Sequence, residues 1–102
     1  MTLAYGLLSV ASTVAAAELG DADAGLKFAT ENCAECHDIT SRNSTSTASG
    51  VPTFYVVANA SGISRTSLLV WMQSSHRKMP NLMIEAQDLD NVIAYILSLK
   101  DK

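Results

Sequence analysis

The sequence predicts a single all-α domain. Its clearest element is residues 85–99, where apolar side chains recur at steps of three and four residues, as along one face of a helix. No β-branched run with alternating polarity indicates a strand. The 102 residues allow one domain, and the formal net charge of -3 argues against binding to nucleic acid. We therefore expect a few helices and loops around one small core.

Residues 1–17 are expected to form an export signal that is removed. They contain no charged side chain and end in three alanines, the small residues after which signal peptidase cuts. A retained membrane anchor is the alternative, although the run is shorter than the ~20 residues that a bilayer span needs. The domain would then comprise residues 18–102 and lie in the bacterial periplasm.

The next stretch, residues 18–36, is predicted to be a helix that begins at Asp21 or Asp23, since either carboxylate can accept hydrogen bonds from the first backbone N–H groups. Small residues recur every four positions along it: Gly25, Ala29 and Cys33. Such a face allows another helix to cross closely, and we expect the C-terminal helix there. An incidental glycine is the alternative.

A Cys-x-x-Cys-His motif follows, formed by Cys33, Cys36 and His37. Two thiols at this spacing can each add to one vinyl group of a haem, and the histidine then lies under the iron, so the motif is typical of c-type haem attachment. A thiol-disulfide oxidoreductase would place the pair between a strand and a helix, which the sequence does not indicate. A zinc site would need carboxylates beside His37 and His76, because the chain has only two cysteines. We predict one covalent haem c.

The polar residues 41–50 have no apolar periodicity and are expected to form a loop that ends at Pro52. The carbonyl of Pro52 could accept a hydrogen bond from the second nitrogen of a histidine ligand. A plain turn proline is the alternative. Residues 54–60 are apolar enough for a short buried helix.

A further helix is expected to be capped by Ser64 or Thr66 and to run through Ser75. It carries the only tryptophan, Trp71. We expect this side chain in the core, against the haem or near its propionates, with ordinary core packing as the alternative.

Met79 is predicted to be the second iron ligand. The helical pattern breaks at Pro80, so Met79 lies on an irregular segment and can project inward. A thioether is a soft neutral ligand that favours Fe(II), and Met/His ligation raises the haem potential. The rivals are Met72, inside an apolar helix where methionine usually fills gaps, Met83, and His76.

In their order along the chain, these motifs resemble those of small monohaem class I cytochromes c of the bacterial periplasm. The resemblance rests on the Cys-x-x-Cys-His motif, Pro52, the Met79-Pro80 pair and an apolar C-terminal helix with one aromatic residue, and it covers everything after the signal. It implies the class I cytochrome c fold, in which the terminal helices cross and short helices and loops surround one haem. It also implies that His37 and Met79 are axial ligands, that Pro52 accepts from His37, and that Gly25 and Tyr95 meet at the crossing.

With both axial positions filled by protein, we expect outer-sphere electron transfer and no enzymatic activity. The first interpretation is a carrier between a periplasmic dehydrogenase and a terminal acceptor. The second is a dedicated subunit of one oxidoreductase, such as a sulfite or alcohol dehydrogenase. The third is a haem sensor or peroxidase-like protein in which Met79 dissociates.

The charges predict how a redox partner docks. Residues 18–38 carry six acids and one lysine, whereas residues 39–84 carry four bases and no acid. In the family the methionine loop borders the exposed haem edge, so Arg77 and Lys78 would place positive charge there. We expect this edge to meet an acidic patch of the partner through a small, transient interface. A solvated loop is the alternative.

Overall fold

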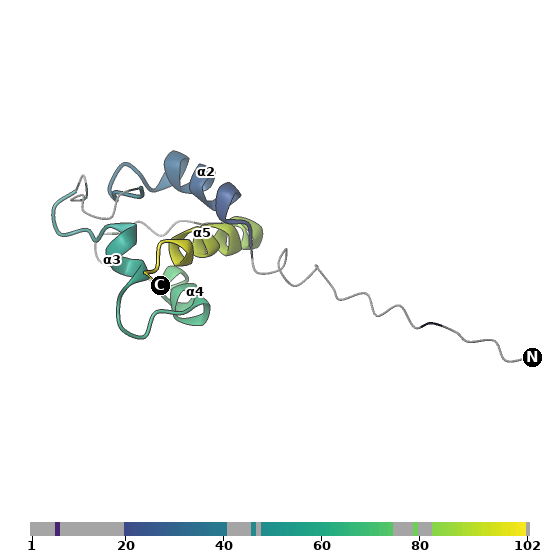
Figure 1. The fold of residues 1–102 in the computed structure, drawn as a ribbon. Coiled ribbons are helices and arrows are strands. Elements are labelled where there is room, and N and C mark those ends of the chain that lie inside the picture. Colours follow the sequence, from purple (N-terminus) through teal and green to yellow (C-terminus); the bar gives the residue numbers. More distant parts are fainter. Residues whose placement is uncertain are drawn as a thin grey trace, which may run out of the picture.

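The computed structural model describes residues 6, 20–40, 46, 48–74, 79 and 83–101. These residues contain four α-helices and no strand, which confirms the all-α prediction (Figure 1). The helices are α2 (Ala22–Asn32), α3 (Phe54–Ala58), α4 (Arg65–Met72) and α5 (Ala86–Ser98). Within the described ranges, no helix is long and apolar enough to cross a membrane. The expected export signal lies outside the described residues except for Gly6.

The core is built on α5, against which each of the other three helices packs (Figure 1). The helix agrees with the predicted residues 85–99 to within one residue at each end. Its periodic apolar side chains are buried, and Val92 and Ile93 are completely enclosed. Among the described helices, α5 contributes the most buried apolar side chains to the core.

The first described helix, α2, begins where its cap predicts. The carboxylate of Asp21 accepts hydrogen bonds from the N–H groups of Asp23, at 2.8 Å, and Ala24, at 3.3 Å. The predicted length of residues 18–36 is wrong, because the helix spans Ala22–Asn32. At the end of the helix the N–H of Ala34 donates to the carbonyl of Ala29, five residues earlier, and residues 33–36 form turns in which the carbonyl of Cys33 accepts from Cys36 and His37.

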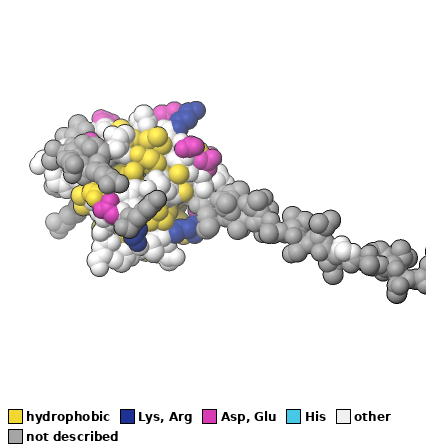
Figure 2. Space-filling model, in the orientation of Figure 1, with side chains coloured by type: hydrophobic (Ala, Val, Ile, Leu, Met, Phe, Trp, Pro, Cys, Tyr) yellow, Lys and Arg dark blue, Asp and Glu magenta, His cyan; other side chains and the backbone are white. Residues whose placement is uncertain are grey.

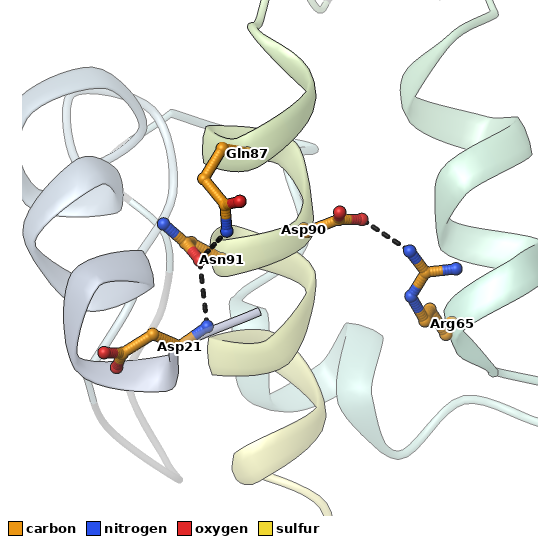
Figure 3. Close-up of polar contacts among 5 residues, drawn as sticks. All are labelled: Asp21, Arg65, Gln87, Asp90 and Asn91. Carbon is orange, nitrogen blue, oxygen red and sulfur yellow. Dashed lines mark hydrogen bonds and ion pairs between the residues drawn. The ribbon is translucent and has the colours of Figure 1, made fainter. Parts of the chain in front are cut away.

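The small-residue face of α2 meets α5, as predicted. Gly25 and Ala29 are buried, and a Cβ on Gly25 would lie 1.9 Å from the backbone oxygen of Asn91 and 2.8 Å from the Cβ of Tyr95. The interpretation of Gly25 as incidental is therefore wrong. The buried Asn91 side chain links the helices, because its Oδ1 accepts from the backbone N–H of Asp21, at 2.9 Å, and from Nε2 of Gln87, at 3.1 Å (Figure 3).

The short helix α3 is two residues shorter than predicted and is capped by the Thr53 hydroxyl, which accepts from the N–H of Val56. The chain end lies beside it (Figure 1). Asn59 accepts from the N–H of Asp101 at 2.8 Å, and the Tyr55 hydroxyl donates to the Asp101 carboxylate at 2.5 Å. These contacts hold the C-terminal end against α3.

The helix α4 is capped by Ser64, which forms a capping box with Ser67. It ends at Met72, before the predicted Ser75. Arg65 joins it to α5 through an ion pair with Asp90, at 2.6 Å (Figure 3).

Trp71 is 61% exposed, so the alternative of ordinary packing in the protein core is wrong. Positions i, i+3, i+4 and i+7 of α4 form its inward face, and Trp71 lies outside that set. The inward set is Arg65, Leu68, Leu69 and Met72, of which Leu68 is the most buried. Contact of Trp71 with haem stays a prediction.

Candidate functional site

The Cys-x-x-Cys-His motif occupies a tight turn at the end of α2. Cys33 is the C-cap residue of the helix, and its carbonyl accepts from the N–H groups of Cys36, at 3.2 Å, and His37, at 3.0 Å. Both cysteines are free thiols, Cys33 buried and Cys36 exposed. The turn brings the two thiol-bearing residues and His37 together on one short segment.

Burial raises the pKa of the Cys33 thiol to about 11. A thiol-disulfide oxidoreductase works through a thiolate whose pKa is lowered by positive charge or a helix N-terminus. Cys33 lies at a helix C-terminus and remains a neutral thiol at pH 7. The site therefore disfavours the oxidoreductase alternative.

His37 is held by the carbonyl of Pro52, as the sequence predicts. The distance from His37 Nδ1 to the Pro52 oxygen is 2.6 Å. A carbonyl can only accept, so Nδ1 carries a proton, and the tautomer with its single proton there has a lone pair on Nε2 that can ligate a metal. The interpretation of Pro52 as a plain turn proline is therefore wrong.

The surroundings of His37 include two residues that the sequence did not single out for this role. The N–H of Phe54 donates to the carbonyl of Asp38 at 2.9 Å, and the Phe54 ring lies 5.2 Å from the His37 ring. The Tyr95 hydroxyl donates to the carbonyl of Ile39. For Phe54, the only sequence feature that could have indicated its proximity to His37 was its position two residues after Pro52. No sequence feature indicated the hydrogen bond from Tyr95 to Ile39.

The methionine side of the site is described only in part. Met79 is half-buried, whereas His76, Arg77, Lys78 and Pro80 lie outside the described residues. Of the rival methionines, Met72 packs against the core from α4 and Met83 is fully exposed. Ligation by Met79 stays a prediction.

No group of three or more His, Cys, Asp or Glu side chains in the described ranges could hold a metal ion by itself. The donor set instead fits a haem, because two thiols in one turn can form its thioethers and His37 offers Nε2 to its iron. Hydrophobic side chains also lie at the surface on the face where α2 crosses α5 (Figure 2). Exposed large hydrophobic side chains occur in several elements: Leu26, Val56, Val70, Trp71 and Met83.

An all-α domain in which α2 crosses α5, with a Cys-x-x-Cys-His turn at the end of α2, defines a c-type haem protein. The family model of cytochrome c matches residues 22–100, and the chain belongs to the cytochrome c family. No curated protein and no solved structure gives a significant match. The family binds haem c covalently and uses it for electron transfer, which is the class of function of this chain.

Proposed function

We propose that the chain is a periplasmic monohaem electron carrier whose iron is ligated by His37 and Met79. The observation that carries the proposal is the 2.6 Å contact between His37 Nδ1 and the Pro52 carbonyl. It fixes the tautomer and the ring direction of a histidine that directly follows two free thiols. Family membership supports the same assignment.

The chain's residues hold the group and close its coordination. Cys33 and Cys36 would hold the haem through thioethers, while His37 and Met79 would ligate its iron and leave no position for a substrate. The bound haem supplies an iron that gains or loses one electron. Ligands that stay bound in both oxidation states would keep the change in iron coordination small, which suits electron transfer to another redox protein.

The partners follow from export and charge. Removal of residues 1–17 would deliver a domain of residues 18–102 to the periplasm, where bacteria attach c-type haem. There the carrier passes single electrons from a dehydrogenase to a terminal acceptor. Arg77 and Lys78 beside Met79 present positive charge to an acidic surface of either partner.

An optical spectrum tests the ligands. The full chain is produced with a cytochrome c maturation system, and spectra are recorded oxidised and reduced, with and without CO. We expect sharp reduced α and β bands, the weak red charge-transfer band of methionine-ligated ferric haem, and no change with CO. A high-spin spectrum that shifts with CO would instead indicate a sensor or peroxidase-like protein. Protein that contains no haem would indicate that Cys33 and Cys36 function as thiols.

Two variants assign the methionine. Met79→Ala is expected to lose the charge-transfer band and to bind CO, because one axial position becomes open. Met83→Ala is the matched control, since Met83 is fully exposed, and its spectrum should equal that of the wild type. The reverse pattern would show that Met83 is the ligand.

A further inference from the structure

The segment that follows His37 is anchored to α5 by one hydroxyl group. Tyr95 Oη donates to the carbonyl oxygen of Ile39 at 2.5 Å. Both residues are buried, Tyr95 at 8% and Ile39 at 5% exposure. The contact joins positions 56 residues apart and ties the histidine segment to the helix on which the core is built.

The same short segment carries the contacts that orient His37. The carbonyl of Asp38 accepts from the N–H of Phe54, and the ring of His37 donates to Pro52. Residues 37–38 and residues 52–54 are thus held together by one hydrogen bond from the His37 ring and one backbone hydrogen bond. The bond from Tyr95 to the Ile39 carbonyl links these two segments to α5.

An aromatic contact adds a second link between Tyr95 and His37. The ring of Phe54 lies 5.2 Å from the His37 ring and 6.4 Å from the Tyr95 ring, measured between centroids. Both pairs are tilted, as aromatic rings prefer. A shift of Tyr95 would therefore reach His37 through the backbone of Ile39 and through the Phe54 ring.

We propose that Tyr95 is a positioning residue for His37, and that its hydroxyl, acting through the Ile39 carbonyl, maintains the His37–Pro52 hydrogen bond and thereby tunes the redox potential. The inference rests on the proposed function, in which His37 ligates iron. A hydrogen bond from Nδ1 makes the imidazole a more basic ligand, which favours Fe(III). A weaker bond therefore shifts the equilibrium toward Fe(II).

The test compares two holoprotein variants that each lose one tyrosine hydroxyl. Tyr95→Phe keeps the ring and removes the bond to Ile39, whereas Tyr55→Phe removes the bond to Asp101 at the chain end. At the wild-type midpoint potential, Tyr95→Phe should raise the ratio of Fe(II) to Fe(III) about threefold, the equivalent of part of one hydrogen bond. Its His37 Nδ1 proton, followed by NMR, should exchange faster with water. Tyr55→Phe should change neither quantity.

Equal ratios and exchange rates in Tyr95→Phe and the wild type would overturn the proposal, as would equal changes in both variants. If Tyr95→Phe does not fold, the wild-type protein decides. The Nδ1 proton should then exchange with water only when the structure opens, at the same free-energy cost as the opening that exposes the α5 amides near Tyr95. Exchange of the Nδ1 proton at a much lower free-energy cost would contradict the inference. A wild-type spectrum without histidine and methionine ligation would show that the proposed function itself has failed.

Discussion

Gly25 lies where α2 touches the backbone of α5, so this position has no room for a side chain. The nearest atom to an added Cβ is the backbone oxygen of Asn91, at 1.9 Å, and backbone cannot rotate away as a side chain can. Gly25→Ala must push the helices apart, and we expect a loss of about 2–4 kcal/mol in the free energy of unfolding. Denaturant titration of the holoprotein measures it.

Thr30→Ala is the control for this prediction, because Thr30 lies on the exposed side of the same helix. It should change the free energy of unfolding by no more than about 0.5 kcal/mol. Equal stability of the Gly25→Ala variant and the wild type would show that the helices do not approach this closely.

Tyr95 makes stability depend on alkaline pH. Burial, and secondarily the charge of Asp38, raises the pKa of Tyr95 above its ordinary value of 10.0. The unfolded chain therefore loses this proton at a lower pH than the folded one, so the contribution of Tyr95 is complete below about pH 10 and is lost as the pH rises through the folded-state pKa. We expect the free energy of unfolding to fall between about pH 10 and the folded-state pKa of Tyr95, as measured by denaturant titration at a series of pH values.

Two variants identify the source of this slope. Tyr95→Phe removes the ionising group and should show a shallower decline, whereas Tyr55→Phe retains Tyr95 and should decline as the wild type does. The same slope in Tyr95→Phe and the wild type would assign the alkaline loss to other groups.

At the level of the helices, the start of α2 is attached to α5 by the Asn91 side chain (Figure 3). Asn91→Ala leaves the N–H of Asp21 without this acceptor, next to a helix end whose other N–H groups depend on the Asp21 carboxylate. We expect a loss of about 1–3 kcal/mol in the free energy of unfolding, together with faster hydrogen exchange in the first turn of α2.

Gln87→Ala is the matched control, because it removes the other hydrogen bond to the same oxygen from an exposed position. It should change stability by no more than about 0.5 kcal/mol and leave exchange in α2 unaltered. Equal exchange in α2 of the wild type and Asn91→Ala would contradict the role of this contact.

The sequence predicted helices best where a periodic apolar stripe is the dominant influence. It placed α5 to within one residue at each end, because burial of that stripe decides the structure. The prediction extended α2 through Cys36, because the hydrogen bonds from Cys36 and His37 to the Cys33 carbonyl cannot be recognised from the hydrophobicity of the sequence. The sequence did not show which side of the short helix α4 carries Trp71, because a single apolar residue does not define a helical face.

The histidine contact with Pro52 was predicted through spacing and resemblance, and the structure contains it. The bond from Tyr95 to Ile39 could not be predicted, since Ile39 contributes only a backbone carbonyl, which every residue has. Such contacts depend on where the turn after His37 lies relative to α5, and that is decided by tertiary packing.

On the scale of the whole molecule, charge is divided between parts of the chain. The described residues carry nine acids and three bases, out of ten and seven in the sequence. One of those three bases, Arg65, is paired with Asp90. The described part is thus an acidic body, and Arg77 and Lys78 form the one pair of adjacent bases in the sequence. A partner with an acidic patch would be attracted to that pair and repelled elsewhere.

Charge reversal distinguishes a docking surface from a solvated loop. Arg77→Glu with Lys78→Glu should lower the rate of electron transfer to the physiological partner about tenfold at low ionic strength and reduce its salt dependence, because attraction during encounter becomes repulsion. The control reverses Lys27 and Lys100, two exposed lysines on the described body, and changes the net charge equally. A purely global effect would slow both double variants alike, whereas docking through the methionine loop requires that only the first be slowed. An unchanged rate and salt dependence in the first variant would mean that Arg77 and Lys78 only keep the loop solvated, and the partner would then have to meet the haem edge through another surface.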